Sequence, residues 1–425
     1  MNDYKDVLNE IGAREDEIVK LCCDLIGFRS VNPPGDVSEI AGFVKDYLLG
    51  KGFKVETVAP DKGRVNVIAS LRGGASTKTF VWNGHLDVVP PGRIEEWKSD
   101  PYKGTLKGSM LVGRGAADMK GSIASALEAA SVIVEKNIEL NGNLTFHFVP
   151  DEETMGKYGT GFLVEKGYYS NVDACIVGEG TCNQLWGPAF AVAEKGILTL
   201  KVKASGRSAH ASMPFLGENA IDKLVRIIPR IEELSQSAIE IDQRLSTLFN
   251  TGKPFYSMFN KILGLNLEQI QRLYTRLTFS PGMIKGGIKS NVVPDEAIAE
   301  IDVRVPPLGD LQETLARIQK VIGESDIKGV TVESLENVEP SYQDPGTPLV
   351  GLVKKCLFDA WGKEPHIMIQ PGGTDARFIR NKLGIPTVVL GPTSETAHSA
   401  NEYVIRKDLT LCSKAYALIA LEYLS

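Results

Sequence analysis

Strand-like and helix-like patterns alternate along most of this chain, and that alternation restricts its fold more than any other feature. Apolar residues recur at helical spacing, which predicts helices over 16–28, 37–50, 120–135, 348–360, 374–382 and 408–424. Short β-branched runs predict strands over 53–58, 65–71, 79–86, 144–149, 174–178 and 385–390. Strands that alternate with helices are typical of an α/β domain with a mostly parallel sheet.

The alternation stops between about residues 188 and 340. Here the chain predicts a long strand over 191–203, an amphipathic helix over 219–234 and two extended segments within 283–305. A further helix over 311–322 and a strand over 330–335 complete the content of a small α+β module. The simplest organisation is an insertion, in which 1–187 and 341–425 form one domain and 188–340 a second. Residues 236–280 lengthen the inserted domain, and their mixed apolar spacing favours helices over a disordered loop.

Length and charge exclude several classes of protein. A chain of 425 residues is longer than one compact core usually holds. Its 47 basic and 53 acidic residues argue against a nucleic-acid-binding protein. The polar N-terminus lacks the features of a signal peptide, and no apolar run approaches the roughly 20 residues that span a membrane. Six cysteines without CxxC spacing indicate reduced thiols, so we expect a cytoplasmic protein with no membrane partner.

Histidine and acidic residues stand where several of the expected strands end. His85 and Asp87 close the run TFVWNG, Asp151–Glu153 follow LTFHFVP, and Glu179 follows ACIVG. Asp118 directly precedes the helix over 120–135, and His398 lies shortly beyond the strand-like IPTVVLGP. Ligands of open parallel sheets bind outside the carboxyl ends of the strands, so these segments should converge. Nitrogen and carboxylate donors without thiolates suit zinc, manganese or cobalt, and this number of donors suffices for two ions.

Each of these residues, taken alone, also has an ordinary structural explanation. A histidine beside a strand is usually part of the core, an aspartate before a helix usually caps it, and a run of acidic residues is usually a solvated turn. Their coincidence at several strand ends, within small-residue segments such as GRGAADMKG, favours a metal site. By contrast, His147 and His366 lie inside strand-like runs, and we assign both to structure.

Eight segments, in their order along the chain, resemble the M20 metallopeptidase family. They are NGHLDVVPPG, GRGAADMKGS, PDEETMGKYG, VGEGT, GRSAHASMPFLGENAI, KSNVVPDEAIAEIDVRVPP, PGGTDARF and AHSANE. The resemblance runs from about residue 10 to the C-terminus, apart from 236–280. It implies an α/β catalytic domain with two metal ions, and an inserted domain that acts as a lid and in dimerisation.

The resemblance also implies a role for each residue at the strand ends. One ion would be held by His85, Asp118 and Glu179, and the other by Asp118, Glu153 and His398, with Asp118 bridging. Glu152 would be the general base and acid, and Asp87 would accept a hydrogen bond from His85 and so select its tautomer. The ions would most simply be zinc, with cobalt or manganese as alternatives. A cis peptide is implied between Asp118 and Met119.

Further residues are implied to contact the substrate. His210 would reach the active site of the other subunit of a homodimer and stabilise the oxyanion. Asn291 would contact the substrate, and Arg304 would clamp its α-carboxylate through two hydrogen bonds. Gly372 and Gly373 would permit a close approach of the backbone to the ligand. A turn histidine at 210 and a surface arginine at 304 remain the structural alternatives.

The function implied is hydrolysis of the amide bond of an N-acyl amino acid. A dipeptidase or metallocarboxypeptidase would use the same site, and the sequence does not indicate which group lies on the acyl side. A catalytically silent binding protein would lack a ligand or the base, whereas all of these positions are filled here. Two features depart from the family pattern: Gly180 follows Glu179 where a proline is frequent, and 236–280 is an insertion.

Overall fold

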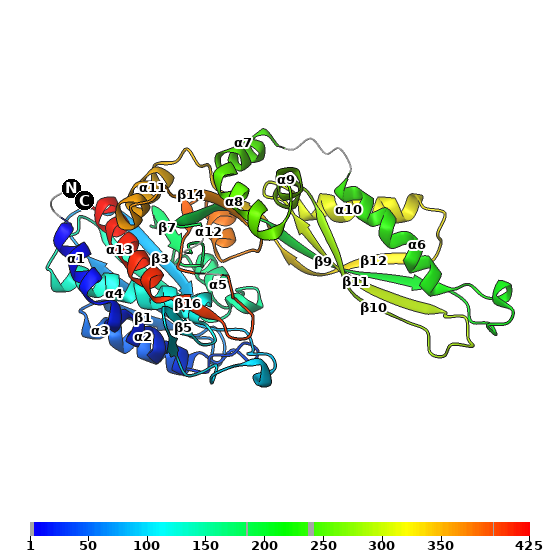
Figure 1. The fold of residues 1–425 in the computed structure, drawn as a ribbon, viewed down its shortest axis with the longest axis horizontal. Helices are drawn as coiled ribbons and strands as arrows, with labels where there is room; N and C mark the ends of the chain where they lie inside the picture. The colour runs from blue at the N-terminus through cyan, green and yellow to red at the C-terminus, as the bar shows by residue number, and fades with distance from the viewer. Residues whose placement is uncertain (1–3, 184–185, 237–241, 394) are drawn as a thin grey trace. The chain divides into compact units, whose positions relative to one another are not determined.

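The computed structural model describes residues 4–183, 186–236, 242–393 and 395–425, and these divide into two compact units (Figure 1). The first unit contains the described residues up to Val192, together with Gln343–Met368 and Thr374–Ser425. The second contains Ala193–Tyr342 and the short segment Ile369–Gly373. Among the described residues, no helix is both long and apolar enough to cross a membrane.

A nine-stranded sheet forms the centre of the first unit, in the order β1-β2-β6-β3-β7-β15-β8-β13, with β14 also paired to β8. The strands are β1 Lys54–Val58, β2 Asn66–Arg72, β3 Thr79–His85, β6 Asn143–Val149, β7 Ala174–Val177, β8 Ala189–Glu194, β13 Ser341–Tyr342, β14 His366–Gln370 and β15 Thr387–Val389. The central strands β6, β3, β7 and β15 are parallel to one another, and antiparallel strands flank them. The α/β class with a largely parallel sheet is therefore confirmed.

Helices surround this sheet (Figure 1). They are α1 Lys5–Ala13, α2 Glu15–Gly27, α3 Ser38–Gly50, α4 Gly121–Glu135, α5 Thr160–Glu165, α11 Pro348–Trp361, α12 Ala376–Leu383 and α13 Arg406–Tyr423. Helix α4 is almost wholly buried because α2 and α13 both pack against it. Its small residues permit this close packing, and the Ser125 hydroxyl donates a hydrogen bond to the Leu409 carbonyl oxygen of α13. The sequence did not predict α1, nor the small sheet of β4 (Thr105–Lys107), β5 (Met110–Val112) and β16 (Tyr403–Ile405).

The second unit is a four-stranded antiparallel sheet covered by two helices. The strand order is β10 (Thr278–Gly286), β11 (Glu296–Val305), β9 (Gly196–Ser205) and β12 (Val330–Val338). Helices α6 (Ala220–Glu232) and α10 (Leu311–Glu324) supply the other half of the core. Buried and partly exposed residues alternate along β9 and β11, because only the face that meets the helices is enclosed.

The single strand expected over 191–203 is wrong: it is two strands, β8 and β9, separated at Lys195. Strand β8 pairs with β15 and β13, whereas β9 pairs with β11 and β12 in a different sheet. The segments on both sides of the break are extended and rich in apolar residues, so in the sequence they resemble one long strand. The choice of pairing partners, which are distant in sequence, decides where one strand ends.

Residues 236–280 contain three helices in the part that the structure describes. These are α7 (Gln243–Thr251), α8 (Lys253–Leu263) and α9 (Leu267–Thr275), which we call the helical insertion. Aromatic rings join them: Phe249 stacks on Tyr256 at a centroid distance of 4.5 Å, and Tyr256 packs against Tyr274 at 4.8 Å. The insertion therefore has a small core of its own within the second unit.

Candidate metal centre

The acidic and histidine side chains singled out at strand ends lie together in the first unit. His85 is the last residue of β3, Glu152 and Glu153 form a short turn after β6, and Glu179 follows β7. Since β6, β3 and β7 are adjacent and parallel, their carboxyl ends meet at one edge of the sheet. Asp118 comes from the turn that precedes α4, and the expected cis peptide between Asp118 and Met119 is confirmed.

Two groups of side chains share the carboxylate of Asp118. In the first group, His85 Nε2 lies 2.9 Å from Asp118 Oδ1 and 3.2 Å from Glu179 Oε1. In the second group, His398 Nε2 lies 3.1 Å from Asp118 Oδ2 and 3.1 Å from Glu153 Oε2. Each oxygen of Asp118 thus faces a different histidine. The structure brings the five predicted ligands together in this way, and their binding of metal stays a prediction.

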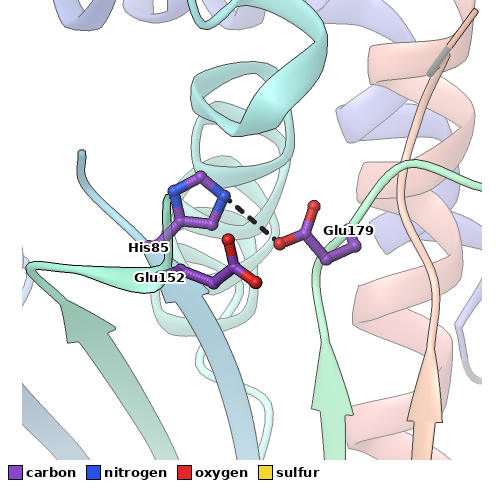
Figure 2. A group of neighbouring side chains, drawn as sticks. All are labelled: His85, Glu152 and Glu179. Carbon is purple, nitrogen blue, oxygen red and sulfur yellow. Dashed lines mark ion pairs between the residues drawn. The ribbon is translucent and has the colours of Figure 1, made fainter. Parts of the chain in front are cut away.

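Glu152 lies beside His85 and Glu179 of the first group, as Figure 2 shows. A carboxylate oxygen of Glu152, a ring nitrogen of His85 and an oxygen of Glu179 lie within 4.8 Å of one another. Donor atoms of His85, Asp118 and Glu153 also lie within 4.8 Å of one another. Glu152 and Glu153 can both face the centre because they stand in a turn; on a strand, neighbouring side chains would point to opposite faces.

The electrostatics of the cluster fit divalent cations. Burial, followed by the charge of Asp118, raises the pKa of Glu179 to about 7. Burial and the neighbouring Glu179 raise the pKa of Glu152 well above its usual range. Oε1 of Glu153 is buried and has no hydrogen-bond partner among the described residues. Crowded carboxylates with an unpaired buried oxygen are costly unless a cation balances them, so the residues present suit a pair of metal ions.

The main chain selects the tautomer of His85. Its Nδ1 lies 2.9 Å from the carbonyl oxygen of Asp87, so Nδ1–H donates there and the Nε2 lone pair faces Asp118 and Glu179. The Asp87 carboxylate is farther from that nitrogen, at 3.5 Å. It instead accepts hydrogen bonds from the backbone N–H groups of Glu152 and Glu153, each at 3.2 Å, and from Asn32 Nδ2 at 2.8 Å. Asp87 therefore holds the turn that carries Glu152 and Glu153.

Glu402 is a supporting residue that sequence reasoning missed. Its buried carboxylate accepts hydrogen bonds from the backbone N–H groups of Ala117 and Asp118, at 2.8 and 3.0 Å, and pairs with Arg114. Burial raises the pKa of Glu402 to about 7. Glu402 thus holds the turn that presents Asp118. Its only sequence signal was its place in AHSANE, close to His398.

Arg377 joins the Glu152 turn to the start of α12. Its guanidinium donates to the carbonyl oxygens of Thr374 and Met155, at 2.7 and 3.0 Å, and lies 4.0 Å from Glu152 Oε1. From sequence we did not assign Arg377 to the site. Its contacts with main-chain oxygens favour a structural role beside Glu152.

The predicted substrate residues lie in the second unit. His210 is exposed, its Nδ1 is hydrogen-bonded to Ser212 Oγ at 2.7 Å, and its loop bridges to Val292. Ala211 N–H donates to the Asn291 carbonyl oxygen at 3.0 Å, so His210 and Asn291 stand in neighbouring loops. Arg304 lies on β11, where its Nε donates to Asp302 at 2.7 Å. Gly372 and Gly373 follow β14. The contacts of these residues with a substrate stay predictions.

Comparison with known proteins supports the resemblance. The family model described as peptidase family M20/M25/M40 matches residues 81–422. A probable succinyl-diaminopimelate desuccinylase of Staphylococcus aureus (strain Mu50) is 26% identical over 95% of this chain and 98% of its own length. An M20 family metallo-carboxypeptidase from Sulfolobus solfataricus has the same fold, with a TM-score of 0.80, 22% identity, and coverage of 96% of this chain and 100% of that one.

Human carnosine dipeptidase 1 also shares the fold, with a TM-score of 0.78, 18% identity, and coverage of 99% of this chain and 98% of its own. The family match extends over most of the chain and includes every residue of the cluster around Asp118. This chain therefore belongs to peptidase family M20/M25/M40, and it is a metal-dependent hydrolase of amide bonds.

Proposed function

We propose that this chain hydrolyses the amide bond of an N-acyl amino acid and releases a carboxylate and a free amino acid. The observation that carries the proposal is the Asp118 carboxylate, which faces His85 with one oxygen and His398 with the other. The similarity to a probable succinyl-diaminopimelate desuccinylase supports an N-acyl amino acid as substrate. Zinc as the metal and the cytoplasm as the location are further parts of this proposal.

Two divalent ions would be held by five side chains of the first unit. The first would bind His85, Asp118 and Glu179, and the second Asp118, Glu153 and His398. Bound ions would supply Lewis acidity, which polarises a carbonyl group and makes water a stronger nucleophile at neutral pH. The main-chain contact at Nδ1 of His85 supports this assignment, because it leaves Nε2 available as a donor to metal.

Glu152 would carry the proton during the reaction. It accepts a proton from the attacking water and delivers it to the leaving nitrogen, so that the amine departs as a neutral group. A carboxylate suits this role when its pKa is raised toward neutrality, and the burial of Glu152 acts in that direction. Asp87 orients Glu152 through the backbone of the turn, and acts as a positioning residue.

The second unit would bind the substrate and complete a homodimer. Arg304 would bind the α-carboxylate, Asn291 and the glycine pair would contact the remainder, and His210 would stabilise the oxyanion in the other subunit's site. Large apolar side chains are exposed in the two loops that carry His210 and Asn291: Phe215 is 80% exposed and Ile288 is 90% exposed. Exposed apolar residues around a site residue support a protein–protein contact there.

A substrate panel tests the reaction. The metal-reconstituted protein is assayed on N-acetyl, N-succinyl and N-formyl amino acids and on dipeptides, each with and without a chelator. We expect chelator-sensitive hydrolysis that prefers one acyl class. A preference for dipeptides would replace the proposal with the dipeptidase or carboxypeptidase alternative. No turnover of any substrate, with two metal ions bound per chain, would contradict it and favour a silent binding protein.

A further inference from the structure

The helical insertion contacts the strand that leads into the predicted glycine loop. The hydroxyl oxygen of Tyr256, on α8, accepts a hydrogen bond of 3.0 Å from the backbone N–H of Ile369 in β14. Both residues are fully buried and both belong to the second unit. Tyr256 is also the ring that Phe249 and Tyr274 pack against, so it joins the core of the insertion to the main chain of β14.

Lys195 forms a second link between the same two parts. Its buried ammonium group donates to the carbonyl oxygens of Leu273 and Arg276 at the end of α9, at 2.6 and 3.2 Å. Its backbone N–H donates to the carbonyl oxygen of Gln370, at 3.1 Å. A helix end offers carbonyl oxygens without partners inside the helix, and Lys195 satisfies two carbonyls at this end of α9. The insertion is thus linked to two consecutive residues, directly to Ile369 through Tyr256 and indirectly to Gln370 through Lys195.

The loop that follows has a glycine that the chain's own packing does not require. A side-chain carbon built on Gly372 would meet no atom within 4 Å, and its φ lies outside the left-handed region. Gly372 therefore satisfies neither a steric nor a conformational need of the described chain. The open space beside Gly372 would let a ligand approach the backbone closely.

We infer that the helical insertion is a substrate-positioning element, and that Tyr256 is the residue through which it holds the Pro371–Gly373 loop. This inference rests on the proposed function, in which Gly372 and Gly373 contact the substrate. Tyr256 acts through Ile369 and does not touch the substrate. Removal of its hydroxyl leaves a buried N–H without its acceptor, so the strand end and the loop gain freedom.

Tyr256→Phe tests the inference, and Tyr274→Phe is the matched control. The control removes a hydroxyl from the same aromatic cluster, but not the one that accepts from Ile369. For Tyr256→Phe we expect faster amide hydrogen exchange in residues 366–374 and a KM that rises about 3- to 10-fold, the factor that one buried hydrogen bond represents. The kcat and the metal content should stay near wild type, and Tyr274→Phe should resemble wild type in every measurement.

Three outcomes would overturn the inference: unchanged exchange in Tyr256→Phe, faster exchange with an unchanged KM, or the same effects in Tyr274→Phe. If Tyr256→Phe does not fold, Lys195→Met probes the other link, with faster exchange of the same peptide and a raised KM expected. If the wild type hydrolyses none of the substrates, the proposed function fails. The exchange rates, which need no turnover, would then still decide whether Tyr256 holds the strand.

Discussion

Glu152 and Glu153 are neighbours in the chain with different surroundings. Glu153 lies 3.1 Å from His398 Nε2, whereas Glu152 lies beside His85 and Glu179 and is 4.0 Å from Arg377. The turn that they share is held by the carboxylate of Asp87 through both backbone N–H groups. The proposed function gives these neighbours different roles, with Glu153 as a metal ligand and Glu152 as the residue that carries the proton.

Replacement of Glu152 by glutamine separates these two roles. Glu152→Gln keeps the size of the side chain but removes the base, so we expect both metal ions to stay bound while kcat falls by roughly 10²- to 10⁴-fold. Metal content per chain and steady-state rates measure the two effects. Glu153→Gln is the matched control, and it should lose metal. Wild-type activity in Glu152→Gln would contradict the assignment of the base.

His147 is a buried neutral histidine that makes folding sensitive to acid. It lies on β6 with its ring 4.6 Å from that of Tyr169, and burial lowers its pKa to about 3. Below pH 6.5 the unfolded chain binds a proton here that the folded chain does not. The free energy of unfolding therefore falls as the pH decreases from 6.5 toward 3.

Substitution of His147 by phenylalanine should remove that part of the acid sensitivity. At pH 5, protonation of His147 in the unfolded chain lowers the free energy of unfolding by roughly 2 kcal/mol, since each pH unit below 6.5 represents about 1.4 kcal/mol. We expect the loss of unfolding free energy between pH 7.5 and pH 5 to be smaller in His147→Phe than in wild type, as followed by denaturant titration. Equal losses in the two proteins would show that His147 is protonated in the folded state.

At the scale of elements, the turn before α4 places Asp118. Two supports act on it: Glu402 accepts from the backbone of Ala117 and Asp118, and the first residue of the helix is Gly121. A side-chain carbon on Gly121 would lie 2.4 Å from the carbonyl oxygen of Ala116. The glycine is therefore needed for the close approach of the turn to the helix.

Gly121→Ala should displace the turn and weaken the metal centre. An overlap with a backbone oxygen cannot be relieved by a side-chain rotation, so the turn itself must shift. We expect metal affinity to fall by about 10-fold or more, the scale typical of a misplaced ligand. Competition with a chromogenic chelator measures it. Gly42→Ala, in α3, is the control because its added carbon meets no atom within 4 Å, and it should bind metal as wild type does.

At the scale of the whole molecule, the proposed homodimer has a consequence for mixed subunits. If His210 serves the partner's site, a subunit with Glu152→Gln can supply His210 to a partner that carries His210→Ala. The site of the His210→Ala subunit then contains its own Glu152 and the His210 of the other subunit, so this site can work. If His210 instead served its own subunit, neither site of the mixed dimer would work.

Mixing the two inactive variants under conditions of subunit exchange tests this arrangement. With random reassociation, half of the dimers are mixed and each has one working site, so about one quarter of the wild-type activity should return. Activity that stays at the level of the separate variants, after exchange is demonstrated with labelled chains, would contradict a site shared between subunits. Mixing either variant with itself is the control.

Local pattern was sufficient for the fold class and for most of the candidate cluster. A strand is recognised by its own residues, and the carboxyl ends of parallel strands share an edge, so His85, Glu153 and Glu179 could be expected together from sequence. Asp118, before its helix, and His398, beyond a strand-like run, were expected at the same edge, and the family motifs supplied the ligand roles of all five residues. These inferences needed only patterns among residues close together in the chain, or family motifs that assign a role to a given residue.

Tertiary structure alone decided the contacts that join distant segments. The two oxygens of Asp118 face histidines that come from separate parts of the chain. Glu402 reaches the Asp118 turn from nearly 300 residues away, Tyr256 meets Ile369, and β8 and β9 separate at Lys195 because their partners differ. Hydrogen-bond partners and strand pairings of this kind depend on how the folded chain brings remote residues together. Periodicity and spacing describe only neighbours, and so they leave these contacts undetermined.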